Sequence, residues 1–162
     1  MSDTLNLKLA PHDYFYWDKR DTKIIESENG EYRLASNIRL NIRRSRDTLF
    51  HLNVKKRAHA NSYYDAKDYA ENISYNFYED QSSLSFDQFF KVPADYPYQQ
   101  QKVKLTLLVP TDNSIYLGEQ LKYFIYDIRN VHRMHNRDMI GNTWKMTRKG
   151  LTCLSCNNLD TQ

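Results

Sequence analysis

Apolar and polar residues alternate along several stretches of this chain, and this alternation restricts its fold more than any other feature. Successive side chains of a β-strand point to opposite faces, so a period of two predicts a strand with one face on a core and the other in water. The pattern occurs at residues 5–9, 38–42, 50–54, 73–77, 84–86 and 103–109. We therefore predict at least five strands.

The register of these strands is a second prediction. A one-residue slip in strand pairing would expose every apolar side chain of a strand to water. The apolar set therefore identifies the buried face. The residues that we expect on one continuous buried face are Ile38, Leu40, Ile42, Leu52, Val54, Leu105 and Leu107.

The aromatic content also favours strands. The 162 residues include 13 Tyr and 7 Phe beside only 4 Gly and 4 Pro, and rings suit a pleated, half-buried surface. One segment departs from the alternation: Asn61 or Ser62 is a suitable N-cap for a helix that would run to Asn72. We predict a mainly β fold, a short β-solenoid-like stack with one inserted helix, with an antiparallel β-sandwich as the alternative.

Length and composition predict a single domain of ordinary size. We expect an N-terminal strand and Tyr-rich loop at residues 1–21, one β-rich domain at residues 22–156, and a polar tail at residues 157–162. No apolar run approaches the roughly 20 residues that span a bilayer, and Met1–Lys8 lacks the features of a signal peptide. The chain is therefore expected to be soluble, and its opening strand suggests a fragment of a longer protein.

The last third of the chain predicts a terminal hairpin. Trp144, Met146, Leu151 and Cys153 are too apolar to be left together in water. The segment 148–150 between them, Arg-Lys-Gly, suits a tight turn. We expect this hairpin to cap the end of the β-stack.

Cys153 and Cys156 form a Cys-x-x-Cys, a spacing found in zinc sites, redox centres and local disulfides. The leading interpretation is two thiols near a chain end, with Cys153 helping to close the core, and a disulfide in an oxidising periplasm is an alternative. His132 and His135 with this pair are the candidates for a zinc shell, but their basic neighbours oppose a cation. We predict no metal and no cofactor.

The overall charge of +3 is the small difference between 23 basic and 20 acidic residues, which is too weak a field to predict a nucleic-acid partner. Locally, basic residues gather on two predicted strands. If those strands pair, they form a contact face for anionic lipid headgroups or, less favoured, single-stranded nucleic acid, and otherwise they are the wet face of a sheet. The candidate contact residues are Arg39, Arg43, Arg44, Lys55 and Lys56.

The sequence carries no Gly-rich phosphate loop, nucleophile elbow, metalloprotease helix or convincing carboxylate pair. We therefore predict no catalytic residues and do not expect an enzyme. Abundant Tyr together with Trp17 and Trp144 suggests a different class, an adhesin-like or carbohydrate-binding β domain, because flat rings stack on sugars.

The order of segments also resembles a known family. Ile38-Arg39-Leu40-Asn41-Ile42 precedes Lys102-Val103-Lys104-Leu105-Thr106-Leu107, and the chain closes with Trp144-Lys145-Met146-Thr147 and Gly150-Leu151-Thr152-Cys153-Leu154-Ser155-Cys156. Over residues 22–156 this order is similar to the C-terminal region of Bacteroidetes proteins with a phage-shock PspC domain, a region related to toast-rack or putative-adhesin β-solenoids.

The resemblance implies a setting for the chain. It would be the soluble end of a probable inner-membrane protein of the cell envelope, on the periplasmic rather than the cytoplasmic side, with the PspC segment and membrane helices upstream. It implies a non-catalytic sensor or scaffold in envelope stress, with protein partners of that system and an anionic membrane surface as contacts. The family supplies no ligand-binding residues to carry across.

Overall fold

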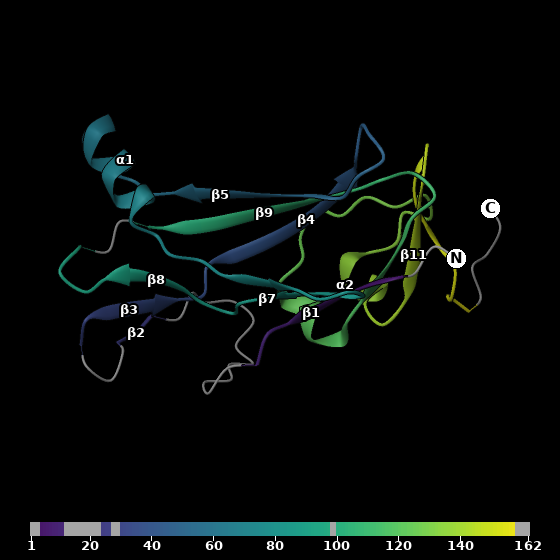
Figure 1. Ribbon diagram of the computed structural model, residues 1–162, viewed down its shortest axis with the longest axis horizontal. Helices are drawn as coiled ribbons and strands as arrows, with labels where there is room; N and C mark the ends of the chain where they lie inside the picture. Colours follow the sequence, from purple (N-terminus) through teal and green to yellow (C-terminus); the bar gives the residue numbers. More distant parts are fainter. Residues whose placement is uncertain (1–3, 12–23, 27–29, 98–99, 158–162) are drawn as a thin grey trace.

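The computed structural model describes residues 4–11, 24–26, 30–97 and 100–157 (Figure 1). These residues form a mainly β structure with several sheets and no closed barrel, which confirms the predicted fold class. The strands are β1 (Leu5–Leu9), β2 (Ile24–Glu26), β3 (Tyr32–Ala35), β4 (Ile38–Arg44), β5 (His51–Arg57), β6 (Phe77–Glu79), β7 (Ser83–Phe86), β8 (Phe90–Pro93), β9 (Lys102–Val109), β10 (Ser114–Leu117), β11 (Thr143–Thr147) and β12 (Gly150–Cys153).

The largest sheet has six strands in the order β12-β11-β10-β1-β7-β6. Its central strand β1 runs parallel to both neighbours, with Leu7 opposite Leu117 on one side and Leu84 on the other. Leu7 is 0% exposed. The first described strand of the chain is therefore a core element of this sheet and not an appendage at its edge.

A second sheet has the order β4-β9-β5, with β4 parallel and β5 antiparallel to β9. Alternate residues of β9, from Val103 to Val109, are buried, and the residues between them are half-buried. Of the predicted buried face, all the β4 and β9 members are buried, which confirms that part of the register. Leu52 and Val54 are only half-buried, because β5 is an edge strand, whereas β4 at the other edge is also bridged by Ile125 at Leu40.

Parallel and antiparallel pairings are mixed in this fold. β2, β3 and β8 form a third, antiparallel sheet, whereas three strand pairs elsewhere are parallel. A purely antiparallel sandwich therefore does not describe the protein. Stacked sheets with parallel neighbours from distant segments agree better with the predicted solenoid-like arrangement.

The predicted helix is confirmed as α1 (Tyr63–Glu71), which projects beyond the end of β5 (Figure 1). Ser62 is its N-cap, and the Ser62 hydroxyl accepts a 3.1 Å hydrogen bond from the Asp65 N–H. The strand predicted at residues 73–77 is wrong. Ser74 makes only an isolated bridge to Lys91, and β6 begins at Phe77.

Shorter helical segments follow β10. The 3-10 helix η1 (Glu119–Tyr123) and the four-residue α2 (Asn136–Met139) pack with the core through the buried side chains of Leu121 and Met139. Within the ranges that the structure describes, no helix is long and apolar enough to cross a membrane.

The predicted terminal hairpin is confirmed. β11 and β12 pair antiparallel, with Trp144 opposite Cys153 and Met146 opposite Leu151, and all four side chains are buried. Gly150 closes the turn at φ +123°, in the region that disfavours residues with a Cβ. The hairpin forms one end of the six-stranded sheet, with β12 as the edge strand.

Candidate functional site

One face of the β4-β9-β5 sheet carries basic residues in register. Arg39 on β4 lies opposite Lys104 on β9, and Lys104 lies opposite Lys55 on β5. One pair further along, Lys102 lies opposite Arg57. Because side chains alternate between faces, all five project from the side of the sheet away from the buried core. We call this surface, formed by Arg39, Lys55, Arg57, Lys102 and Lys104, the basic sheet face.

The basic contact face predicted from sequence is only partly correct. β4 and β5 do not pair with each other, because β9 lies between them. Arg39, Arg43 and Lys55 share the outward side of the sheet, whereas Arg44 and Lys56 occupy the alternate positions of their strands and project from the opposite side. Adjacent basic residues on one strand cannot belong to one face.

The sequence reasoning missed Lys102 and Lys104. The alternation of Lys and apolar residues at the start of β9 was visible, and it indicated an outward basic side for that strand. What the sequence did not reveal was that β9 is the central strand. Only that position brings Lys104 between two other basic residues.

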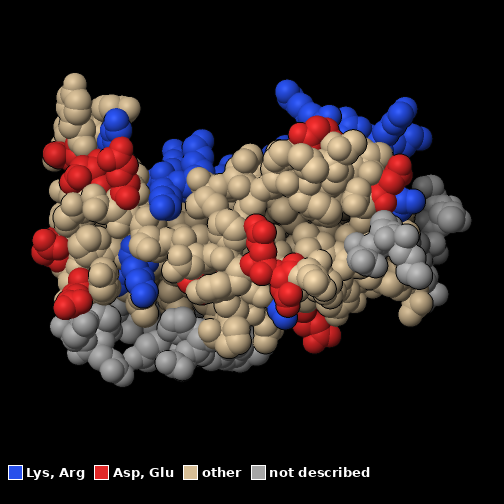
Figure 2. Space-filling view, in the orientation of Figure 1, with Lys and Arg blue, Asp and Glu red and all other residues tan. Residues whose placement is uncertain are grey.

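The basic sheet face lacks carboxylate partners. Within the described ranges, none of its five side chains forms an ion pair. The Lys104 ammonium instead lies 5.6 Å from the centre of the Tyr126 ring, and the Arg39 guanidinium donates to the carbonyl oxygens of Ile38 and Tyr123. Figure 2 shows blue side chains gathered in two groups along the upper edge of the molecule.

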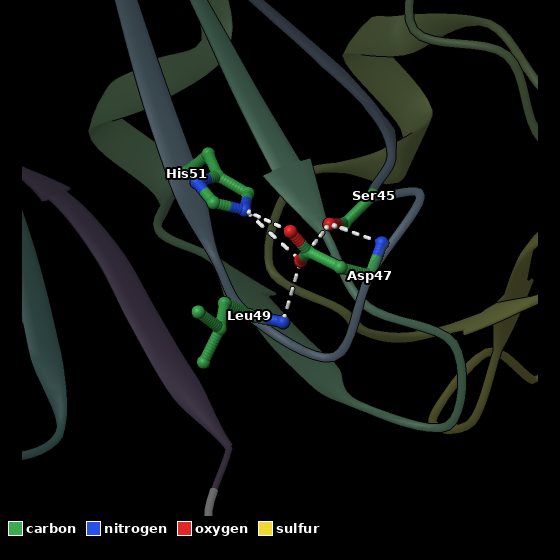
Figure 3. A network of polar contacts seen from close by, with 4 residues as sticks. All are labelled: Ser45, Asp47, Leu49 and His51. Atoms are coloured by element: carbon green, nitrogen blue, oxygen red, sulfur yellow. Dashed lines mark hydrogen bonds and ion pairs between the residues drawn. The ribbon is translucent and has the colours of Figure 1, made fainter.

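The turn between β4 and β5 is fixed by one carboxylate (Figure 3). The Asp47 carboxylate accepts hydrogen bonds from the Leu49 N–H at 2.8 Å and the Ser45 hydroxyl at 3.0 Å, and it contacts the His51 Nε2 at 2.9 Å. The bond from Leu49, followed by those from His51 and Ser45, lowers the pKa of Asp47 below its ordinary value of 3.8. This network orients the chain between the two strands.

The four zinc candidates do not form a metal shell. Cys153 and Cys156 are joined by a disulfide, so the interpretation as two free thiols is wrong and the disulfide alternative is correct. The His132 Nε2 accepts a 3.2 Å hydrogen bond from the Cys153 N–H, and His135 lies at the start of α2. Among the described residues, no three His, Cys, Asp or Glu side chains come together to hold a metal ion.

The structure describes one of the two tryptophans proposed for sugar stacking, Trp144. Trp144 is 0% exposed, and its indole N–H donates a 3.0 Å hydrogen bond to the Met139 carbonyl, so it cannot stack on a sugar. Trp17 lies outside the described residues. The exposed aromatic pair is instead Tyr63 and Tyr64 at the start of α1, with exposures of 74% and 81%.

Comparison with known proteins identifies a family. A family model described as the ToastRack found in some PspC proteins matches residues 24–159. No curated protein and no solved structure matches the chain. The matched range contains every strand from β2 to β12, so the match covers the basic sheet face and the terminal hairpin. The chain therefore belongs to the ToastRack family that is found in some PspC proteins.

Proposed function

We propose that this chain is a non-catalytic sensor or scaffold domain of a membrane-attached, phage-shock-type envelope stress-response protein. We further propose that it acts through the basic sheet face. The observation that carries this proposal is the row in which Arg39, Lys104 and Lys55 lie directly opposite one another.

Such a row opposes the stability of the sheet. Like charges placed opposite each other on neighbouring strands are destabilising, and this face repeats the arrangement with Lys102 and Arg57. No carboxylate of the described residues offsets the repulsion. An arrangement that costs stability and recurs in two rows is best explained by a contact with an acidic surface.

An anionic bilayer suits this face better than a protein partner. The basic residues lie on the open side of a sheet, and a sheet presents several cations at similar depth to a flat surface. Membership of a family found in PspC proteins supports a nearby membrane, and each basic residue near an anionic membrane contributes about 1 kcal/mol. The exposed Tyr63 and Tyr64 are residues of the kind that favour a membrane interface.

The compartment proposed is the periplasm. The Cys153–Cys156 disulfide supports this, because disulfides persist in oxidising compartments and are rare in the bacterial cytosol. In this setting the domain would hold or sense protein partners of the stress system beside the inner membrane.

The test is co-sedimentation with vesicles of phosphatidylcholine, with and without phosphatidylglycerol. The wild-type chain should bind only when the anionic lipid is present. The variant Lys55→Gln/Lys104→Gln should bind about 30-fold more weakly at low salt, since two basic residues at about 1 kcal/mol each amount to about 2 kcal/mol.

The matched control is Lys67→Gln/Lys145→Gln, which also removes two positive charges. Both of these lysines already face carboxylates, at 3.8 Å from Glu71 and 4.0 Å from Asp112, so their loss should change binding little. If both variants lose vesicle binding equally, the binding depends only on net charge. That result would contradict a specific role of the basic sheet face. In cells, the full-length protein with Lys55→Gln/Lys104→Gln should respond more weakly to envelope stress, and an unchanged response would contradict the proposed role.

A further inference from the structure

A cavity of about 250 Å³ opens beside the last residues of β4, between that strand and the turn of the β11-β12 hairpin. We call it the edge pocket. Residues 41–44 form one wall, residues 146–151 form the other, and Asp127 and Arg129 contribute from the connecting segment. Its volume is at the lower end for ligand sites, which suits a small molecule or a headgroup.

The edge pocket exists because residues 124–126 run beside β4 only as far as Leu40 and then turn away. Leu40 accepts a hydrogen bond from the Tyr126 N–H and donates one to the Phe124 carbonyl, so residues 124–126 extend the sheet at that point. Asp127 then adopts φ +49°, a left-handed conformation, and the chain turns away. In a parallel ladder alternate residues face the same edge, so the Ile42 N–H points toward the vacated edge.

The charge of the edge pocket is strongly positive. Five basic residues line it, against the single acidic residue Asp127; they are Arg43, Arg44, Arg129, Arg148 and Lys149. Within the described part of the chain, none of the five forms an ion pair. The Arg44 guanidinium donates a 3.0 Å hydrogen bond to the Arg148 carbonyl and so ties the two walls together.

One lining group also lacks a hydrogen-bond donor. Asn41 is 2% exposed, and its Nδ2 donates to the carbonyls of Tyr126 and Asp127 at 3.3 and 3.1 Å. These bonds fix the orientation of the amide, because the opposite orientation would place oxygen against oxygen. The Asn41 Oδ1 is the buried side-chain atom of the described residues that has no partner. The atom has almost no accessible surface, so a ligand in the pocket does not reach it, and the role of Asn41 is to hold residues 126 and 127 beside β4.

We propose that the edge pocket binds a small polyol phosphate, with the phosphate held by the basic side chains and a hydroxyl donating to the Asp127 carboxylate. Arginine forks match phosphate oxygens in pairs, which favours phosphate as the anion. This inference goes beyond the proposed function, because it uses a different set of side chains from the basic sheet face.

The mixture of groups selects a hydroxyl beside the phosphate. Inorganic phosphate at neutral pH offers mainly acceptor oxygens, so it gives the Asp127 carboxylate little to accept from. An ammonium group could donate, but five cations around the pocket oppose it. The Asp127 carboxylate repels a phosphate yet accepts from a hydroxyl, so it favours a ligand that carries both groups.

The test is a titration of the isotopically labelled chain with glycerol 3-phosphate, followed by the amide resonances of Ile42, Thr147 and Gly150. Glycerol 3-phosphate should bind at least about tenfold more tightly than inorganic phosphate, and glycerol alone should not bind. The variant Arg129→Gln/Arg148→Gln should weaken glycerol 3-phosphate at least about tenfold. Both residues are exposed, so the variant should retain the wild-type melting temperature.

The matched control is Lys55→Gln/Arg57→Gln, which removes two charges from the basic sheet face. It should leave binding of glycerol 3-phosphate unchanged while weakening binding to anionic vesicles. Membrane binding by the basic sheet face and ligand binding in the edge pocket can therefore be disproved independently. Vesicles containing phosphatidylglycerol distinguish the source of the ligand. If Arg129→Gln/Arg148→Gln also weakens vesicle binding, the site takes a lipid headgroup, and if it affects only glycerol 3-phosphate, the site takes a soluble ligand.

Three results would overturn the inference. They are no shift of the pocket amides at millimolar glycerol 3-phosphate, equal affinity for inorganic phosphate, and binding that survives Arg129→Gln/Arg148→Gln. Equal affinity would show that no hydroxyl reaches Asp127, and survival would show that the pocket is not the site.

Discussion

The six-stranded sheet and the β4-β9-β5 sheet both alternate apolar and polar residues along their strands. They differ in the charge of the polar side chains that lie opposite one another on neighbouring strands. In the larger sheet, Asn6 lies between Ser83 and Tyr116, and the row is neutral. In the smaller sheet, the equivalent kind of row is Arg39, Lys104 and Lys55, three like charges. Neutral rows are compatible with stability alone, whereas aligned cations reduce it. We infer that the six-stranded sheet mainly stabilises the fold, whereas the β4-β9-β5 sheet carries a surface for contact with a partner.

The largest expected effect is in the larger sheet. Leu7→Asp would place a charge at a position that is 0% exposed and between two parallel partners. A buried, unpaired carboxylate costs several kcal/mol, comparable to the whole stability of an ordinary domain. We expect loss of the cooperative unfolding transition by circular dichroism. Asn6→Asp, one residue away and exposed, should change the free energy of unfolding by no more than about 0.5 kcal/mol, and similar effects of the two changes would break the comparison.

The next effect is expected at the terminal hairpin. Trp144→Ala removes a fully buried ring and should lower the free energy of unfolding by about 3–5 kcal/mol in a denaturant titration. Trp144→Phe keeps most of the volume but loses the hydrogen bond to the Met139 carbonyl, so it should cost less. A loss below about 1 kcal/mol for Trp144→Ala would mean that the hairpin is peripheral to the core.

A smaller effect is expected at the disulfide. Cys153→Ser/Cys156→Ser should leave the fold intact and lower the free energy of unfolding by about 1–2 kcal/mol, because the bridge closes a short loop. Thermal unfolding under non-reducing conditions would measure the difference. Wild-type protein with reductant should match the double variant, and global unfolding of that variant would contradict the limited role assigned to the bridge.

The turn beside the smaller sheet should contribute a pH-dependent effect. The lowered pKa of Asp47 means that its ionised form stabilises the folded chain at pH above the ordinary carboxyl range. That contribution is lost as the pH falls through the ordinary value toward the lower folded value. The stability difference between wild type and Asp47→Asn should therefore shrink between about pH 5 and pH 2.

The smallest effect on stability is expected at the basic sheet face. Lys55→Gln/Lys104→Gln should change the free energy of unfolding by no more than about 0.5 kcal/mol, and relief of repulsion favours a slight increase. Urea titrations at low salt would show it. A loss of more than about 2 kcal/mol would mean that these lysines support the fold, and it would remove the contrast between the two sheets.

The sequence predicted what depends on neighbours along the chain. Alternation identified β4, β9 and their buried positions, Ser62 identified the start of α1, and apolar residues around Arg148 and Lys149 identified the hairpin. In each of these cases the deciding interactions lie within one strand, one turn of helix or one tight turn. The prediction at residues 73–77 failed because helix and strand signals overlap there.

Features that depend on distant pairing could not be predicted. Arg39 and Lys104 are adjacent only because two segments from different parts of the chain pair in parallel, and alternation does not specify which strands are neighbours. The edge pocket could not be predicted from the sequence for the same reason, since Asn41, Asp127 and Arg148 come from three separate segments. The Cys153–Cys156 bridge was open to several interpretations because its spacing is shared by metal, redox and structural pairs.

The central position of β1 has a consequence for how the protein is made. β1 leaves the ribosome before every other described strand, yet Leu5 pairs with Ile115, 110 residues later. At about 5–20 residues per second, it waits roughly 5–20 seconds for that partner. Such long-range parallel pairing also folds slowly. Until β7 follows, 77 residues after Leu7, the residues Leu5, Leu7 and Leu9 form an unpaired apolar strand, so the nascent chain should depend on a holding chaperone.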